Sequence, residues 1–298
     1  MQKLTPFYEK VQSHYDLSDE FFELFLDPTR TYSCAFFERD DMTLEEAQLA
    51  KVDLALRKCD LRPGMTLLDI GCGWGSTMLR AAERYDVDVI GLTLSRNQYE
   101  HVSGLLSQMS SGGRSAEVRL QGWEDFDEPV DRIVSIGAFE HFRRQRYDTF
   151  FDRTSNILPD DGRMLLHTIV GHSRDQLETM KVPVYREDAL FLRFILREIF
   201  PGGQLPERDL VITGAQRHNF WVQNIESLQP HYARTLDMWT RALESRHDDA
   251  VRMASEEVYQ RYIKYLTGCA ENFRRRLIDV QQFTLVKQQR SRGPGDEP

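Results

Sequence analysis

Three glycines that directly follow an apolar segment constrain the fold of this chain more than any other feature. Residues 67–75 read LLDIGCGWG. Glycines at alternate positions let a backbone turn tightly and approach a ligand where a Cβ would collide, and the amides of the following helix can then face that ligand. A tight strand-to-helix turn also needs glycine for structural reasons alone. The pattern indicates a strand, a turn and a helix that together cradle a small-molecule cofactor.

The second strand argues against a nicotinamide cofactor. In a nicotinamide-binding unit an acidic residue ends the second strand, about 20 residues beyond the glycines, and holds the ribose hydroxyls. Here residues 87–95 read VDVIGLTLS, so Thr93 and Ser95 stand at the strand's exit, and Gln98 follows one turn later. The glycine spacing is also GxGxG rather than GxGxxG. Both differences indicate a cofactor other than NAD.

Apolar segments that alternate with helical patterns predict an α/β fold. Strands are expected over residues 65–70, 87–92, 117–120, 132–136 and 164–169. A capping box at Thr43 and Glu46 opens a helix over residues 44–61, which Pro63-Gly64 should end, and Ser18 can cap a short helix. The alternation predicts a parallel sheet with helices on both faces.

The alternation stops after the fifth strand. Residues 172–206 carry Phe191, Phe194 and Ile199 at helical spacing, and residues 231–276 are mainly helical in pattern. These apolar faces have no further strand of the alternating series to cover. They must therefore cover either more core or an apolar ligand.

Charge and hydropathy narrow the class of protein. The chain has 38 Lys and Arg against 47 Asp and Glu, a formal net charge of −9. Nucleic acids and anionic bilayers both attract clustered cations, so neither is expected as the main partner. The sequence has no apolar run long enough for a membrane span, and its first ten residues lack the apolar segment of a secretory signal. We expect a cytoplasmic protein with no integral membrane association.

The cysteines indicate neither a metal site nor disulfides. Cys34, Cys59, Cys72 and Cys269 lack the paired short spacing of zinc sites, and a cytoplasmic setting disfavours disulfides. We expect four free thiols and no metal. Cys59 and Cys72 are expected to fill space in the core, whereas Cys34 and Cys269 either pack there or line a site.

Several motifs together resemble the S-adenosylmethionine-dependent cyclopropane fatty acid synthases, and in particular their mycolic acid branch. Four motifs lie in the cofactor-binding half: DIGCGWG (69–75), GLTLSRNQ (91–98), QGWEDF (121–126) and SIGAFEHF (135–142). Four more lie outside it, at residues 14–37, 198–206, 228–236 and 265–274. The resemblance covers residues 5–287. It implies methyl transfer to the double bond of a long unsaturated acyl chain, a mycolic acid precursor, and formation of a cyclopropane ring.

The resemblance also implies an architecture. It is a Rossmann-like class I methyltransferase fold with a mainly parallel seven-stranded sheet and a helical cap. We expect one domain over residues 1–287, with N-terminal helices (1–62), a cofactor-binding core (63–171), a helical insertion (172–206) and a C-terminal part (207–287). The tail 288–298, rich in Pro, Gly and charged residues, is expected to be disordered.

The implied reaction explains the residue types. An isolated alkene has no proton to remove at the outset, so catalysis must stabilise the carbocation that methyl addition creates and then remove a proton from the new methyl group. This requires a dry pocket, aromatic faces and a positioned base. Seven aromatic residues could supply the faces, although each alone also suits a core: Tyr15, Tyr32, Phe36, Phe37, Phe139, Phe142 and Tyr232.

In this family the base is thought to be a bound bicarbonate or carbonate ion. The matching motifs place around it Cys34, the backbone of Ile136, Glu140, His167 and Tyr232. Glu140 would orient the ion through a shared proton, while His167 and Tyr232 donate to its oxygens. The resemblance also marks Cys269 as an active-site residue, although a cation mechanism needs no covalent nucleophile.

The resemblance assigns S-adenosylmethionine to a second set of residues. Thr93 and Gln98 would replace the missing acid at the ribose, and Trp123 with Glu124 would bracket the adenine. The complete set of expected contacts is Tyr32, Ser33, Leu67, Leu68, Asp69, Ile70, Gly71, Cys72, Gly73, Trp74, Gly75, Thr93, Leu94, Ser95, Arg96, Asn97, Gln98, Trp123 and Glu124.

Two positions bear on the carrier and the product. Family members often read Gly-His after EHF, whereas this chain has Arg143, Arg144 and Arg146, which form either a solvated loop or a basic rim for an acidic acyl carrier protein. Hydroxyl-forming relatives carry an acidic side chain at the position of Gly137, so glycine favours ring closure over capture of water.

Other functions and properties stay open from the sequence. The alternatives are a methyltransferase acting on a small-molecule amine or hydroxyl, a methyl-branch or hydroxyl-forming mycolate methyltransferase, and a lipid-binding protein with a vestigial cofactor pocket. The intact cofactor motifs speak against the last. Residues 172–187 match the family's sequences poorly, so the length of the acyl chain stays open. The oligomeric state, a monomer or a dimer, also stays open.

Overall fold

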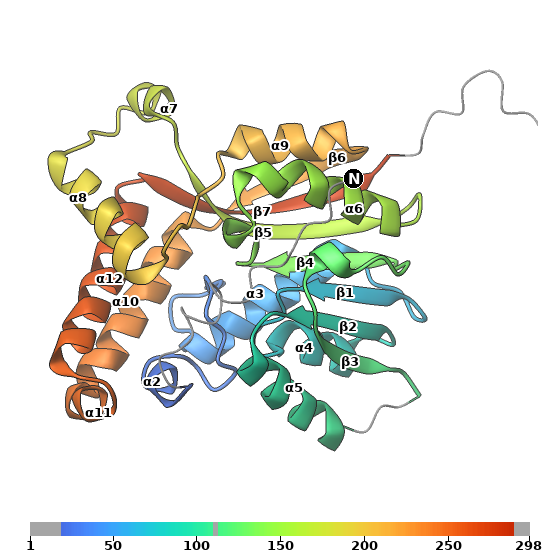
Figure 1. Ribbon diagram of the computed structural model, residues 1–298, viewed down its shortest axis with the longest axis horizontal. Coiled ribbons are helices and arrows are strands. Elements are labelled where there is room, and N and C mark those ends of the chain that lie inside the picture. The colour runs from blue at the N-terminus through green and yellow to red at the C-terminus, as the bar shows by residue number, and fades with distance from the viewer. Residues whose placement is uncertain (1–18, 110–112, 289–298) are drawn as a thin grey trace, which may run out of the picture.

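A seven-stranded sheet runs through the middle of the molecule (Figure 1), in the order β3-β2-β1-β4-β5-β7-β6. This is a computed structural model, and it describes residues 19–109 and 113–288. The strands are β1 (Thr66–Ile70), β2 (Asp88–Thr93), β3 (Ala116–Leu120), β4 (Arg132–Ile136), β5 (Arg163–Gly171), β6 (Phe220–Ser227) and β7 (Ile278–Lys287). The first five are parallel, and β7 is antiparallel to both β5 and β6. The five predicted strands are confirmed within a few residues, and β6 and β7 complete the sheet.

Helices cover both faces of the sheet, as the alternation predicted. One face carries α3 (Leu44–Cys59), α4 (Ser76–Arg84) and α5 (Arg96–Gln108), and the other carries α6 (Tyr147–Ile157) and α9 (Arg208–Arg217). The capping box of α3 is present at Thr43 and Glu46, but the helix ends earlier than predicted, at Asp60 in the left-handed conformation. This residue reverses the chain before Pro63-Gly64 is reached.

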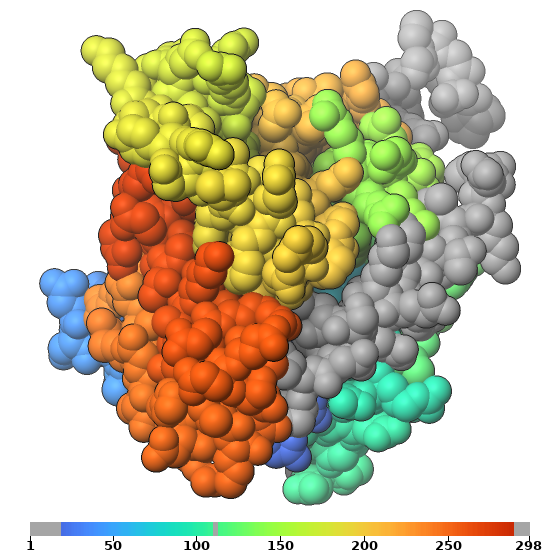
Figure 2. Space-filling model, turned by 60° about the vertical axis from the view of Figure 1, so that its left-hand side comes forward, coloured from blue at the N-terminus to red at the C-terminus, as the bar shows by residue number. Residues whose placement is uncertain are grey.

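The remaining α-helices and one π-helical turn gather at one end of the sheet (Figure 1). They are α2 (Asp19–Glu23), α7 (Arg174–Thr179), α8 (Arg186–Phe194), the π-helical turn η4 (Ile195–Ile199), α10 (Gln229–Ser245), α11 (His247–Met253) and α12 (Glu256–Arg274). Figure 2 shows the segment from α7 to η4, in yellow-green and yellow, lying over the orange α10–α12 side. No helix in the described part of the chain has the length and hydropathy to cross a membrane.

The packing of residues 172–206 shows how much of their apolar surface covers the core of the protein. Phe191 of α8 lies against Gly268 of α12, where a Cβ on the glycine would come within 2.1 Å of the ring. Leu190 and Leu192 nevertheless remain about half exposed, at 51% and 52%. The insertion therefore covers core with only part of its apolar surface. The predicted cap at Ser18 and nearly all of the predicted disordered tail lie outside the described residues.

Candidate functional site

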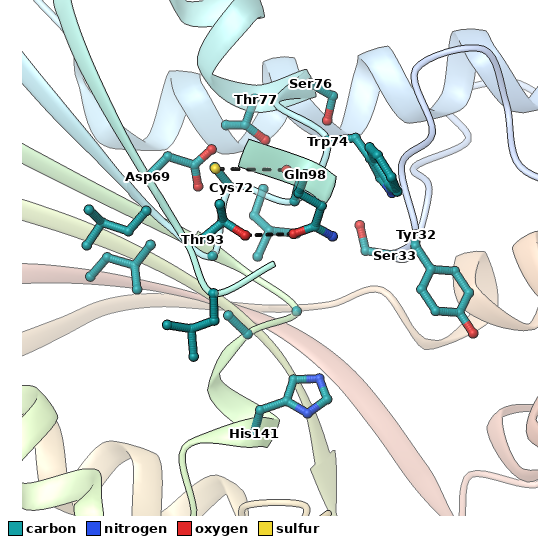
Figure 3. Close-up of a pocket in the computed structure, with 18 of the residues that line it drawn as sticks. Tyr32, Ser33, Asp69, Cys72, Trp74, Ser76, Thr77, Thr93, Gln98 and His141 are labelled. Atoms are coloured by element: carbon teal, nitrogen blue, oxygen red, sulfur yellow. Dashed lines mark hydrogen bonds between the residues drawn. The ribbon is translucent and has the colours of Figure 1, made fainter. Parts of the chain in front are cut away.

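A cavity opens at the carboxyl ends of β1, β2 and β4, where the strand order reverses (Figure 3). In open α/β sheets this reversal leaves a crevice in which ligands bind. The lining comes from the segment before α3 (30–33), from Lys51 of α3, from the turns after β1 (69–74), β2 (92–94, Gln98) and β3 (121–124), and from the segment after β4 (136–138, 141–142), with two residues of α4.

The glycine turn has the geometry of a ligand cradle. Gly71, Gly73 and Gly75 all have positive φ, at 79°, 55° and 88°. The Gly71 and Cys72 amides donate to the Leu92 carbonyl at 3.0 and 2.9 Å, which fixes the turn against β2. A Cβ on Gly71 would lie 2.5 Å from the Cβ of Ala138, whereas one on Gly73 would meet no atom within 4 Å. Gly73 therefore borders open space, as a backbone that approaches a ligand must.

Two buried carboxylates in the cavity lining lack a partner for one oxygen. Asp69 is 2% exposed and Glu124 is 5% exposed. Asp69 Oδ2 and Glu124 Oε2 have no hydrogen-bond partner among the described residues. Burial raises the pKa of Asp69 to about 7, and burial is also the main reason why the pKa of Glu124 is raised. Unpaired buried acceptors cost stability, so the cavity suits a ligand with hydrogen-bond donors at both positions.

The residues expected at the ribose and adenine lie on neighbouring turns. Thr93 Oγ1 donates to Gln98 Oε1 at 2.8 Å (Figure 3), which leaves the Gln98 amide NH₂ as a donor. Trp123 packs edge-on against Phe150, with ring centroids 5.3 Å apart. Glu124 Oε1 accepts from Arg146 Nη1 at 2.6 Å. Arg146 is therefore turned inward and does not extend the basic rim that the sequence suggested.

The structure places most, but not all, of the expected cofactor contacts in the cavity lining. Tyr32, Ser33, Asp69 to Trp74, Thr93, Leu94, Gln98, Trp123 and Glu124 line it, together with Ile136 from the ion-site set. Six others do not: Leu67, Leu68, Gly75, Ser95, Arg96 and Asn97. The two leucines belong to the sheet core, Ser95 caps α5, and Arg96 and Asn97 are exposed.

Glu140 lies just beyond the cavity, in the short helix η2 (Phe139–His141). It is 8% exposed, and its Oε1 accepts from the Ile169 amide at 2.6 Å while Oε2 has no partner among the described residues. Burial raises the pKa of Glu140 to about 7, against smaller opposing effects of its hydrogen bonds. Glu140 can therefore both hold and release a proton near neutral pH.

Three more of the expected catalytic residues are neighbours of Glu140 or of one another. Burial raises the pKa of Tyr232 well above its usual value, and Tyr265, Cys34, Cys269 and Glu140 raise it further. Burial also raises the pKa of Cys269 to about 12 and that of Cys34 well above its usual value. All four thiols of the chain are free, and these two are protonated at neutral pH. Such thiols are poor covalent nucleophiles.

His167 borders the same region from β5. It pairs in register with Ile136 of β4, and its ring Nδ1 lies 3.3 Å from Gln282 Nε2. Burial, with help from Lys51 and Lys58, lowers the pKa of His167 well below its usual value. Alternation along the strand puts His167 on the same face as Ile169, which packs against the cluster containing Cys34 and Tyr232. A neutral imidazole therefore lies beside that cluster.

The aromatic residues expected to surround a cation do not form one group. Tyr32, Phe36 and Tyr232 belong to the cluster at the helical end, Phe139 and Phe142 to the cluster under α6, and Phe37 to a third. Tyr15 lies outside the described residues. The sheet separates the cluster under α6 from the other two clusters, which both pack against Leu44. No spacing in the sequence indicated this division.

Lys51 lines the cavity and was missed by the sequence reading. It is 1% exposed and stands in the buried stripe of α3 between Ala47 and Ala55. A lysine at an apolar position of a helical stripe is the signal that could have identified it, because lysine is almost never fully buried without a partner. No group of three or more metal-binding side chains exists in the described ranges.

A family model and a known protein of high sequence identity indicate the same family for this chain. The sequence model of the mycolic acid cyclopropane synthetase family matches residues 2–283. Cyclopropane mycolic acid synthase 1 of Mycobacterium tuberculosis (strain H37Rv) is 60% identical over 285 residues, which cover 96% of this chain and 99% of that protein.

Two solved structures share the whole architecture. The cyclopropane synthase MmaA2 from Mycobacterium tuberculosis matches with a TM-score of 0.94 at 59% identity, covering 96% of this chain and 100% of its own. The mycolic acid cyclopropane synthase CmaA1, solved in complex with SAH and CTAB, matches with a TM-score of 0.92 at 59% identity and the same coverage.

Proposed function

Because the chain belongs to the mycolic acid cyclopropane synthetase family, we propose that it adds a methyl group to the double bond of a long unsaturated acyl chain and closes a cyclopropane ring. It is an S-adenosylmethionine-dependent methyltransferase by type. The observation that carries the proposal is the adjacency of two sites. A glycine-cradled cavity with unpaired acids lies directly beside a buried acid, Glu140, that is poised near neutral pH.

The cavity residues fit the cofactor by their unsatisfied groups. When bound, S-adenosylmethionine supplies an electrophilic methyl group. In the proposal, Glu124 Oε2 accepts from an adenine amino group, and the Gln98 amide donates to a ribose hydroxyl. Ile136, Gly137 and Ala138 form the wall on the side of Glu140. In the proposal, the double bond of the acyl chain lies beside this wall.

The second half of the proposal concerns the proton. We assign the base to a bicarbonate or carbonate ion held by Glu140, Tyr232, His167, Cys34 and the backbone of Ile136. Its support is Glu140 Oε2, which has no partner among the described residues, and the closeness of Tyr232 both to that carboxyl and to Cys34. Buried and neutral, His167 and Tyr232 can each donate a hydrogen bond without bringing a competing charge.

Apolar surroundings favour ring closure over capture of water. A Cβ at Gly137 would have Ser33 Cβ as its nearest neighbour, at 3.7 Å, so a side chain there would reach the cavity. Glycine leaves this position without a group to activate water. The acyl chain would then extend into the aromatic cluster between α10 and α12, and the detergent CTAB in the related CmaA1 structure is consistent with an apolar ligand.

Delivery of the acyl chain is part of the proposal. An acidic acyl carrier protein could meet Arg143 and Arg144 after η2, of which Arg144 is exposed and Arg143 half-buried. Arg146 does not contribute, because it pairs with the buried Glu124. A cytoplasmic location and a monomer or dimer stay predictions.

The test is the product. We expect incubation with S-adenosylmethionine and a carrier-bound unsaturated long-chain acyl substrate to add the mass of one CH₂ group, and proton NMR to show high-field ring signals. Glu140→Gln is the matched variant that tests the proposed base. It keeps the size of the side chain but removes the carboxylate, so turnover should fall about a hundredfold or more, in the range of a lost general base.

Three outcomes would contradict the proposal. A hydroxylated product would refute the argument from Gly137. Turnover that stays unchanged both in Glu140→Gln and in bicarbonate-depleted buffer would refute the ion site. Methylation of a small amine in place of the lipid would refute the substrate class.

A further inference from the structure

Lys51 is a buried ammonium that the proposed reaction does not use. Its Nζ donates to Ser33 Oγ at 2.9 Å. Three residues earlier on α3, Gln48 Nε2 donates to the Ser33 carbonyl at 2.8 Å and to the Thr31 carbonyl at 3.3 Å. These two side chains hold the segment 31–33 in place as one wall of the cavity.

Holding residues 31–33 in place does not by itself require a charged side chain at position 51. Burial lowers the pKa of Lys51 to about 8, although nearby Cys34, Asp27 and Asp69 favour its charged form. An ammonium has three donors, and the structure records one hydrogen bond for this one among the described residues. A methionine of similar length would fill the space without the desolvation penalty of a buried charge.

A second charge in the same cavity suggests what the ammonium recognises. Asp69 lines the cavity near the end of β1, two residues before the first glycine of the cradle, and its Oδ2 has no partner among the described residues. The cavity therefore presents one buried cation and one buried acid to a ligand. Ligands that carry both an ammonium and a carboxylate match this pair in charge, and the amino-acid end of S-adenosylmethionine is such a group.

We propose that Lys51 is the positioning residue for the carboxylate at the amino-acid end of the cofactor, and that it acts through Ser33. The inference rests on the proposed function. Ser33 Oγ accepts from Lys51, so its own O–H is available to donate into the cavity, and Figure 3 shows Ser33 among the residues that face it. Hydrogen bonds to a charged group are the stronger kind, and a nearby cation in a buried site reinforces them.

The experiment compares two ligands that differ only in the carboxylate. S-Adenosylmethionine and its decarboxylated form share the adenosine, the sulfonium and the amine. We expect calorimetric titration of Lys51→Met to show affinity for the first weakened by about tenfold or more, the size of a lost charge-assisted hydrogen bond. Affinity for the decarboxylated ligand should stay close to that of the wild type.

Lys58→Met is the matched control, on the same helix. Lys58 is also largely buried, with a side chain 14% exposed, but it pairs with Glu226 and lies outside the cavity lining. The Lys58→Met variant should bind both ligands with the affinities of the wild type. Because the ammonium acts through the hydroxyl, Lys51→Met should also cost much less in a Ser33→Ala background than in the wild type.

Equal weakening of both ligands by Lys51→Met would show that Lys51 only supports the wall, and would overturn the inference. If Lys51→Met does not fold, Ser33→Ala gives the same comparison, in which selective loss of the carboxylate-bearing ligand supports the inference and unselective loss overturns it. A wild-type protein that binds neither ligand would instead overturn the proposed function.

Discussion

Gly71 and Gly73 stand two residues apart in one turn, yet a side chain at each would meet different surroundings. We expect Gly73→Val to abolish binding of S-adenosylmethionine while the fold survives, because its side chain would enter open cavity space, at a cost in backbone strain of about 1–3 kcal/mol. Gly71→Ala should instead lower the unfolding temperature, because its Cβ would lie 2.5 Å from that of Ala138. Calorimetric titration and thermal unfolding separate the two effects. Wild-type affinity in Gly73→Val would contradict the cradle.

Glu140 should make stability depend on pH. Burial raises the pKa of its carboxyl from 4.5 to about 7, so between these values the folded state holds a proton that the unfolded state has lost. Stability from this group is complete below pH 4.5 and is lost as the pH rises to about 7. The loss is on the order of 3 kcal/mol.

The matched variant isolates that group. Glu140→Gln cannot ionise and can still accept from the Ile169 amide. In urea unfolding at a series of pH values, its stability relative to the wild type should therefore increase from pH 4.5 to about 7. A stability difference that does not change with pH would show that Glu140 does not titrate in this range.

At the scale of elements, the junction between α8 and α12 depends on the absence of one side chain. A Cβ on Gly268 would lie 2.1 Å from Phe191 Cε2, so Gly268→Ala must displace the ring. We expect faster hydrogen exchange across residues 172–206 and a destabilisation of about 1–3 kcal/mol, which is typical of overpacking. The neighbouring Thr267 is exposed, so Thr267→Ala should change neither. Equal exchange in both variants would mean that α8 is held elsewhere.

Some elements can be identified from neighbouring residues in the sequence, and others cannot. The capping box at Thr43 and Glu46 marks the start of α3, because it is an interaction between residues three apart. The end of α3 at Asp60 carries no comparable signal, since a left-handed aspartate has no fixed neighbour pattern. The alternation that identified the first five strands did not identify β6 and β7, which pair antiparallel with their neighbours in the sheet.

At the scale of the whole molecule, the cavity joins segments from across the first half of the chain, from Arg30 to Phe142. A ligand that binds only the folded state adds stability by about 2.7 kcal/mol at 100 times its dissociation constant. We therefore expect S-adenosylhomocysteine to raise the unfolding temperature in a concentration-dependent way, and NAD at equal concentration to have no effect. Stabilisation by NAD alone would refute the cofactor assignment.

The family and the fold class followed from the sequence because their signals are local: short motifs of a few consecutive residues for the family, and the alternation of apolar and helical segments for the fold class. Asp69 and the three glycines that follow it are an example, and the structure and the comparisons confirm both conclusions. The roles of Glu140, His167 and Tyr232 were likewise inferred from their motifs, and they stay predictions.

Only the tertiary structure decided which distant residues meet. Lys51 donates to Ser33, Arg146 turns in to Glu124, and Phe191 fills the space beside Gly268. Local periodicity identifies the buried face of an element, but it does not specify the partner across that face. That choice depends on how the sheet and its helices pack, and so the charge of the cavity and the inward turn of Arg146 could be learned from the folded chain alone.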